Sequence, residues 1–538
     1  MRGGDGLNPG VSGSGARIRS EVRTIQPQKT AVRRAAVGCA VMAATQRATT
    51  HSADVVVVGG GSSGAAVAGR LAAAGVNVLL VEAGPDYGPF GSGRWPKEIL
   101  DATALATSHD WGYTSGPLPG RAPFTWERAR IMGGCSAHNG AIAAVGHRSD
   151  YDAWGVPGWA TDELRPFFAA ALAAMRVRAY QPEEAGPFHA RCLVAAETAG
   201  WRIASDLCDL DANESFGLET VNVFEGVRWN SAFAYLDPVR DSGHLSIIDR
   251  AIVDRVEETA TGAVVHAVVD GQPVTIGGDT VVLAAGVYGT PAILQRSGVG
   301  DPDRLRRVGV TPVVESPLVG SNLHDHPMVN AGREMVDDLR RAIEHESARG
   351  FVPEEQTLGK SRSSLATDGL YDTHLFPVCA STQTTLTDGR ALVEVACMTP
   401  RSRGRVDIVS PDPEAHPHID HAYLTDPDDH DITVLRDGLV LAEELLSQSA
   451  LADVLLPEPA RDLSDAAIRR DVMHYYHPVG TTPMGVDPAT SVCGPTGHVH
   501  GMQHVVVGDV SLMPQVPRAN TNIPAVVIGE RIASFLLG

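Results

Sequence analysis

The 538-residue chain lacks the features that mark several classes of protein. Its seven cysteines form no Cys-x-x-Cys pair and are odd in number, which argues against a disulfide scaffold and a cysteine-based zinc site. No apolar run reaches the roughly 18 residues of a membrane-spanning helix. Acidic residues outnumber basic ones by 64 to 44. We therefore expect a cytoplasmic protein that binds neither nucleic acid nor an anionic membrane.

The composition that remains is that of a globular protein. Hydrophobic residues make up 43% and charged residues 20%, and the length suffices for two or more structural units. Residues 1–50 differ, with eight basic residues, two acidic ones and abundant Gly, Ser, Arg and Thr. They imitate a secretory signal only weakly, so we expect a disordered N-terminal extension.

A βαβ unit follows this segment. Residues 54–58 form a continuous β-branched run, typical of a strand buried on both faces. Residues 62–74 predict a helix that ends at Gly75, and residues 76–81 predict a second buried strand. Such a unit begins a doubly wound sheet. Further strands are expected at 245–248, 263–269, 280–284 and 505–507, and a last helix at 524–536.

The turn between the first strand and the first helix reads Gly-x-Gly-x-x-Gly. Gly59 permits a tight turn, Gly61 lets a pyrophosphate approach the backbone, and Gly64 lets the helix pack against the strand. Ser63 lies in the first helical turn, whose N–H groups attract phosphate. Glu82 ends the second strand, where a carboxylate accepts ribose hydroxyl hydrogens and disfavours a 2′-phosphate. The motif therefore predicts FAD or NAD.

Five further segments carry long motifs. They read RARIMGGCSAHN with a following DYDAW (128–154), GVYGTPAILQRSGVG (286–300), VGSNLHDHP (319–327), YHPVGTTPMG (476–485) and DVSLMPQVPRANTNIPAVVI (509–528). With the glycine motif, they resemble the glucose–methanol–choline (GMC) flavoprotein oxidoreductases, and most of all their choline oxidase and dehydrogenase members, over residues 54–538. Val287 stands where that family prefers a small residue, but Thr290 and Pro291 fit.

The resemblance implies FAD and an α/β fold (α+β overall). In it a Rossmann-like FAD-binding domain is interrupted by a substrate-binding domain with a mostly antiparallel sheet and helices. We expect residues 51–150, 241–325 and 473–538 to form the FAD-binding domain, with active-site residues in its last part. Residues 151–240 and 326–472 are expected to form the substrate domain.

The resemblance also assigns residues around the flavin. The segment with Gly133, Gly134 and Asn139 lies beside the flavin ring, where the glycines let backbone N–H groups reach it. His138 either carries a covalent bond to the flavin 8α-methyl group or packs over the ring edge without one. The other residues implied are Val253, whose backbone reads adenine, Asp509 and Val510, beside the ribityl and pyrimidine part, and Asn522, which holds the loop before the last helix.

Alcohol oxidation needs a group that handles the hydroxyl proton while a hydride goes to flavin N5. His477 is the candidate acid/base, because imidazole titrates near neutral pH. By resemblance its partner is Asn520, which cannot take a proton and so orients the alcohol oxygen. Two histidine-rich stretches, at 324–326 and 414–421, invite a metal interpretation, but their places in the family pattern favour structural roles, and we expect no metal.

The substrate is expected to be a small-molecule alcohol, with oxygen, a quinone or another carrier as electron acceptor. Compact family members include dehydrogenases associated with the peptide-derived carrier mycofactocin, so a non-oxygen acceptor is one alternative. A lyase without net oxidation and a non-catalytic flavin-binding protein are two more. The pair His477 and Asn520 favours the redox enzyme.

Overall fold

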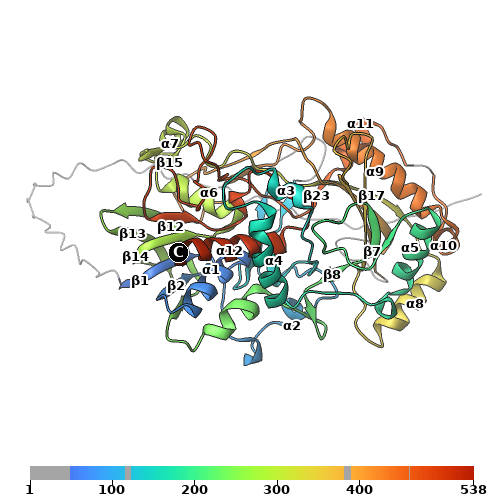
Figure 1. Ribbon diagram of the computed structural model, residues 1–538, viewed down its shortest axis with the longest axis horizontal. Helices are drawn as coiled ribbons and strands as arrows, with labels where there is room; N and C mark the ends of the chain where they lie inside the picture. The colour runs from blue at the N-terminus through green and yellow to red at the C-terminus, as the bar shows by residue number, and fades with distance from the viewer. Residues whose placement is uncertain (1–48, 116–122, 381–388, 460) are drawn as a thin grey trace, which may run out of the picture. The chain divides into compact units, whose positions relative to one another are not determined.

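The computed structural model describes residues 49–115, 123–380, 389–459 and 461–538 (Figure 1). The extension expected over residues 1–50 therefore lies almost wholly outside the described residues. From residue 49 onward the chain builds two seven-stranded sheets. Within the described ranges, no helix has the length and apolar character needed to cross a membrane.

The first sheet has the parallel core expected for dinucleotide binding. Its strand order is β11-β2-β1-β14-β13-β12, and β24 pairs with β14. The strands are β1 Thr49–Val58, β2 Val78–Val81, β11 Leu245–Ile248, β12 Ala251–Thr259, β13 Gly262–Val269, β14 Gln272–Leu283 and β24 Val505–Val507. β12 and β13 extend the parallel strands as an antiparallel hairpin. Val56 and Leu80 are fully buried, as their continuous apolar runs predict.

Two helices cover this sheet next to its glycine turn. α1 (Ser62–Ala73) packs on β1 and β2 and along α12 (Asn522–Leu537) (Figure 1). The helices approach closely because Gly529 has no side chain: a Cβ there would lie 2.3 Å from the Ser63 carbonyl oxygen. α12 begins two residues before the expected start at Pro524, since proline is tolerated in a first turn. α12 also packs against α4 (Thr161–Ala174).

The second sheet is almost entirely antiparallel. Its order is β23-β17-β20-β19-β18-β7-β6, and only β6 and β7 run parallel. The strands are β23 Met473–His474, β17 Pro327–Arg333, β20 Ala391–Cys397, β19 Thr373–Cys379, β18 Thr357–Ser361, β7 Ser215–Leu218 and β6 Ile203–Ala204. Helices α5 (Pro187–Thr198) and α9 (His430–Leu446) pack on one face. The opposite face carries Phe376, Ala396 and Met328, which pack with Tyr475.

The remaining described elements connect or flank the two sheets. The helices are α2 Lys97–Leu100, α3 Arg148–Asp152, α6 Gly286–Arg296, α7 Pro302–Arg307, α8 Asp337–Ser347, α10 Ser449–Ala452 and α11 Asp465–Asp471. The short strands are β3 Tyr113–Thr114, β4 Thr125–Trp126, β5 Arg178–Ala179, β8 Thr220–Val221, β9 Val223–Phe224, β10 Val227–Arg228, β15 Val299–Gly300, β16 Val314–Glu315, β21 Arg405–Asp407 and β22 His418–Asp420.

Segments of the chain alternate between the two sheets. The first sheet takes strands from residues 49–81, 245–283 and 505–507, and the second from 203–218, 327–397 and 473–474. The expected fold, a Rossmann-like unit interrupted by a mostly antiparallel one, is confirmed. The domain boundaries stay a prediction, since strand membership does not assign the helices and loops between them.

Candidate active site

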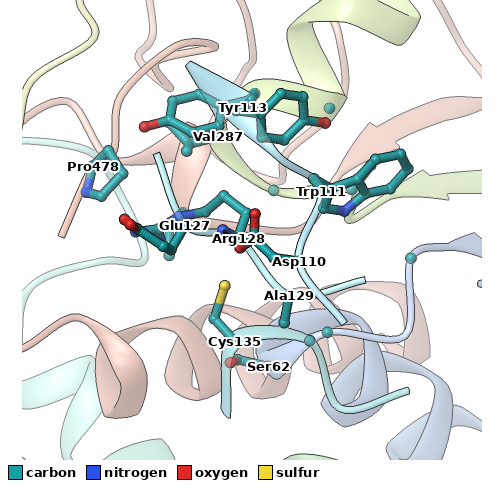
Figure 2. Close-up of a pocket in the computed structure, with 18 of the residues that line it drawn as sticks. Ser62, Asp110, Trp111, Tyr113, Glu127, Arg128, Ala129, Cys135, Val287 and Pro478 are labelled. Atoms are coloured by element: carbon teal, nitrogen blue, oxygen red, sulfur yellow. Dashed lines mark hydrogen bonds between the residues drawn. The ribbon is translucent and has the colours of Figure 1, made fainter. Parts of the chain in front are cut away.

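A cavity of about 640 Å³ is lined by residues of both sheets. Figure 2 shows part of it, with Arg128 and Cys135 between the glycine turn at Ser62 and the rings of Trp111 and Tyr113. Thirteen of the fifteen predicted site residues line it: Gly59, Gly61, Ser63, Glu82, Gly134, His138, Asn139, Val253, His477, Asp509, Val510, Asn520 and Asn522. Gly64 and Gly133 do not line it. The cavity therefore brings the glycine motif and the candidate catalytic pair into one space.

The three motif glycines differ in what requires them. Gly59 has φ +99°, and a Cβ on Gly64 would lie 1.9 Å from the Gly59 carbonyl oxygen, so the fold itself requires both. A Cβ on Gly61 would meet no atom nearer than 3.8 Å, yet Gly61 lines the cavity and precedes α1 without any side-chain cap. The open space at Gly61 fits a pyrophosphate that approaches a free helix N-terminus.

Glu82 fixes the glycine turn. Its carboxylate accepts hydrogen bonds from the backbone N–H groups of Gly60 and Gly84, each at 2.7 Å. Burial raises the pKa of this carboxyl, and the two N–H donors oppose that shift. Glu82 also lines the cavity, so it holds the turn while facing the position expected for a ribose.

Asp509 and Gly133 hold backbone segments in place at the cofactor end of the cavity. Asp509 accepts from the Gly286 N–H at 2.8 Å and from the Thr290 hydroxyl at 2.6 Å, which fixes the start of α6. The Gly133 N–H donates to the Gly60 carbonyl at 2.8 Å, which ties the 133–140 segment to the glycine turn. Gly133 therefore lies behind the cavity wall and holds Gly134 in place.

His138 lies in the cavity wall with a free ring nitrogen. The side chain is buried, and its Nδ1 has no hydrogen-bond partner. Burial, reinforced by the Arg128 guanidinium, lowers its pKa to about 4, so the imidazole is neutral near pH 7. A neutral, unpartnered nitrogen suits either predicted role beside a flavin. At the other end, the Val253 carbonyl accepts from Arg296 at 3.2 Å.

His477 is held by its backbone and by one ring nitrogen. Tyr476, directly before it, has the left-handed φ of +64°, a conformation that costs energy for a bulky residue and clusters at functional sites. The His477 N–H donates to Asp325 at 2.9 Å. The His477 Nδ1 lies 3.0 Å from Nδ1 of His326, so Nε2 is the nitrogen left to meet a ligand.

The surroundings keep His477 neutral. Burial lowers its pKa well below 6.5, and neighbouring imidazoles and the Arg128 guanidinium lower it further. Arg128 lines the cavity and donates to the Tyr476 carbonyl at 3.1 Å. A neutral imidazole can accept a proton near pH 7.

Asn520 ends a loop that is pinned on both sides. The Val516 N–H donates to His324 Nε2 at 2.9 Å, and Arg518 bonds Asp150 through its backbone and guanidinium, each at 2.9 Å. Asn520 Oδ1 is buried without a partner, and its residue lines the cavity. Asn522 accepts from the Ser62 hydroxyl at 3.2 Å, which links this loop to α1 as its predicted loop-holding role requires.

Sequence reasoning missed three residues around His477. Asp325 and His326 were read as structural members of a histidine-rich loop, yet they contact His477 directly. Arg128 opens the motif of residues 128–139 but received no role. The available signal is the pattern His-Asp-His-Pro itself. Its pairing with His477, which is 151 residues beyond His326, depends on the long-range bridge between His324 and Val479.

The two histidine-rich stretches do not form a metal cluster among the described residues. The single group there with suitable atoms close together is Cys397, His430 and Asp431. The Asp431 carboxylate accepts from the backbone of Arg401 and Ser402 at 2.7 and 3.0 Å. Backbone donors already engage both oxygens of that carboxylate, so this group has the contacts of a structural cluster.

Similarity to known proteins agrees with this site. Family models described as GMC oxidoreductase match residues 53–328 and 400–529. The chain is 30% identical to choline oxidase of Arthrobacter globiformis, over 88% of this chain and 92% of that protein. It is 29% identical to an oxygen-dependent choline dehydrogenase of Rhizobium etli, over 88% and 93%.

Solved structures share the fold. Pyridoxine 4-oxidase from Mesorbium loti superposes with a TM-score of 0.78 at 25% identity, covering 90% of this chain and 98% of that one. Formate oxidase of Aspergillus oryzae gives the same TM-score at 23% identity, covering 91% and 98%. The motifs, the two interleaved sheets and these matches lead to one conclusion: the chain belongs to the GMC oxidoreductase family, as an FAD-dependent enzyme acting on CH–OH donors.

Proposed function

We propose that the protein oxidises an alcohol to an aldehyde or ketone, with His477 as acid/base and Asn520 as the group that orients the alcohol oxygen. The observation that carries this proposal is the pair of unsatisfied side chains at one cavity. His477 Nε2 has no bond to the described chain, and Asn520 Oδ1 is buried without a partner. Buried polar groups normally find partners, so these two await a ligand's polar atoms.

The proposed proton transfer requires one particular tautomer of His477. Base action needs a lone pair on His477 Nε2, so Nδ1 must carry the hydrogen and donate to His326 Nδ1. The hydroxyl proton of the alcohol then moves to Nε2 as the C–O bond gains double-bond character. FAD held by the glycine turn and the 133–140 segment would supply the acceptor for the hydride of the same carbon. The Asn520 amide N–H can donate to the alcohol oxygen while the hydroxyl proton goes to His477, and Oδ1 can accept from another donor of the ligand.

His138 gives the proposal a second part. We expect its free ring nitrogen to bond the flavin 8α-methyl carbon, as in choline-oxidase-like members, or to pack over the ring edge. The mass of the denatured protein separates the two: a gain of one FAD, lost in His138→Ala, supports the bond. An unmodified mass rejects it.

The relatives' names guide the choice of substrate and acceptor. Choline, a quaternary ammonium alcohol, is named for several of them, and oxygen for four. For this chain the acceptor is proposed to be oxygen, a quinone or another carrier, and mycofactocin-type carriers belong to the last group.

An anaerobic screen of alcohols tests the proposal. The expected result is bleaching of the bound flavin by at least one alcohol, with one carbonyl product per flavin, and reoxidation by air or by a quinone. Product without bleaching would indicate a lyase. Failure of every alcohol, together with an unchanged spectrum in His477→Ala, would indicate a non-catalytic flavin-binding protein.

A further inference from the structure

Three glutamates lie near one another beside the cavity: Glu355 and Glu394 line it, and Glu219 interacts electrostatically with Glu355. Glu394, on β20, is 4% exposed and lines the cavity, as does Glu355, just before β18. Glu219 follows β7 and is 1% exposed, and neither of its carboxylate oxygens accepts a hydrogen bond. Within the described residues, the side-chain carboxylates of Glu355 and Glu394 take part in no ion pair or hydrogen bond; only their backbones pair with neighbouring strands. We call these three residues the glutamate cluster.

The cluster has one cationic neighbour, and it makes no ion pair with that neighbour in the described residues. The buried Arg228 interacts electrostatically with Glu355, but its guanidinium donates to the carbonyl oxygens of Ile99, Ala137, Asp101 and Ala104. Ionised carboxylates without a counter-charge are costly to bury. Burial, with Glu354 second, raises the pKa of Glu394 to about 8. The site therefore needs either protons or a cation from outside the chain.

A separate observation at the same place also calls for a ligand. Tyr475 is 4% exposed and lines the cavity, yet its hydroxyl has no hydrogen-bond partner. All three glutamates are charge neighbours of this tyrosine. Phe376 pairs with Glu394 across β19 and β20, so the two side chains share one face of the sheet.

The aromatic rings connect the cluster to the candidate base. The Phe376 and Tyr475 ring centroids are 6.0 Å apart, and the Tyr475 and His477 centroids are 4.5 Å apart. A substrate whose hydroxyl meets His477 can therefore extend along these rings toward Glu394. Ring faces attract cations, which strengthens the preference set by the carboxylates.

We propose that Glu355 and Glu394, the two cluster members that line the cavity, bind a protonated amine of the substrate together with the Tyr475 hydroxyl, so that the enzyme oxidises amino alcohols whose ammonium group carries N–H donors. This inference rests on the proposed function and names its substrate class. The carboxylates and the hydroxyl need donors as well as charge. A polyol supplies donors without charge, and a quaternary ammonium supplies charge without donors.

A matched substrate series tests the inference. Flavin reduction would be followed anaerobically with ω-amino alcohols, their N-trimethyl derivatives and n-alkanols of equal length. We expect the amino alcohol to react about tenfold faster than the alkanol, or more, at low concentration, because charge-assisted hydrogen bonds are strong. Equal rates for amino alcohol and alkanol, or a preference for the trimethyl compound, would overturn the inference and leave the alcohol oxidation standing.

Glu394→Gln and Glu355→Gln keep the shape and remove the charge. Each should lower the rate with amino alcohols about tenfold and leave the rate with alkanols unchanged. Glu414→Gln is the matched control, because Glu414 lines the same cavity but is exposed; it should change neither rate. Equal losses for both substrates in Glu394→Gln would mean a structural role and would overturn the inference.

A binding measurement separates this inference from the proposed function. Propylammonium cannot be oxidised as an alcohol, so calorimetric titration of the holoenzyme reports the subsite alone. Wild type should bind it more tightly than propyltrimethylammonium, and Glu394→Gln should bind it about tenfold more weakly. If no alcohol bleaches the flavin but this pattern appears, the subsite stands and the oxidation fails. If propylammonium binds wild type and Glu394→Gln alike, the subsite fails.

Discussion

The carboxylates at the cofactor end of the cavity and those near its substrate end differ in their hydrogen bonding. At the cofactor end, the carboxylates of Glu82 and Asp509 each accept two or more hydrogen bonds from the protein. At the substrate end, Asn520 Oδ1, the Tyr475 hydroxyl and both Glu219 oxygens have no partner. At the cofactor end, protein donors satisfy the carboxylates and fix the backbone. At the substrate end, polar atoms remain available to hydrogen-bond a ligand.

This difference predicts which substitutions should affect folding and which should affect substrate binding. Substitutions at the cofactor end disturb a network that supports the fold, because its donors and acceptors also hold α1, α6 and the glycine turn. Substitutions at the substrate end remove groups that the fold does not use. Buried polar atoms without partners are destabilising, so these groups lower the free energy of unfolding of the protein.

The largest expected effect comes from a pair of glycine variants at the cofactor end. Gly64→Ala should abolish the folded protein, at a cost of about 4 kcal/mol or more, because its Cβ would lie 1.9 Å from a backbone oxygen. Gly61→Ala should keep the melting temperature of the apoprotein and lose FAD, because its Cβ enters open space beside α1. Thermal melts and flavin content check both. Full FAD content in Gly61→Ala would break the assignment of the phosphate site.

His477→Ala should act at the substrate end alone. Loss of the acid/base should slow anaerobic flavin reduction about 100- to 10,000-fold, while FAD content and melting temperature stay near wild type. His474→Gln is the control: this histidine is buried nearby and contacts Glu127 at 3.4 Å but does not line the cavity. A similar loss of rate in both variants would show general damage to the loop.

The pH dependence sharpens the comparison further. The pKa of His477 is lowered well below 6.5, first by burial, so the base is already neutral at pH 7. Activity that needs the neutral imidazole is lost only as pH falls through this lowered pKa. Stopped-flow flavin reduction by an uncharged alkanol, which does not use Glu394, should therefore be flat from about pH 8 down to about pH 6.5. A decline centred at or above pH 6.5 would contradict the assignment.

The smallest effect is on stability at the glutamate cluster. Burial raises the pKa of Glu394 from 4.5 to about 8. A raised pKa means that the stability contribution of Glu394 is fully present below pH 4.5 and is lost as pH rises through about 8. Wild type should lose stability relative to Glu394→Gln over that window, by about 1 kcal/mol or more. Parallel melting curves across the window would show that a hidden partner satisfies Glu394.

The sequence predicted the cofactor end better than the substrate end because the two ends depend on different separations along the chain. Gly59, Gly61 and Glu82 lie within one βαβ unit, so their spacing sets their geometry. Glu394, Phe376 and Tyr475 come from three separate segments, and the pairing of β19 with β20 brings two of them to one face. No local pattern specifies that register.

Element boundaries show the same limit. β1 was expected over residues 54–58 but begins at Thr49, because the strand continues alongside β14 through the pairs of Ser52 with Gly277 and Ala53 with Gly278. Long-range pairing extends the strand where local hydrophobicity is weak. His326 was missed for a related reason: its partner His477 is 151 residues away.

The central claim is that one cavity places the alcohol between His477 and the flavin, and an anaerobic single turnover with an alcohol deuterated at the carbinol carbon tests it most directly. The account predicts flavin bleaching that is slower with the deuterated alcohol and yields one carbonyl compound per flavin. An oxidised flavin after every alcohol has been offered, in a protein with full FAD content, would contradict it.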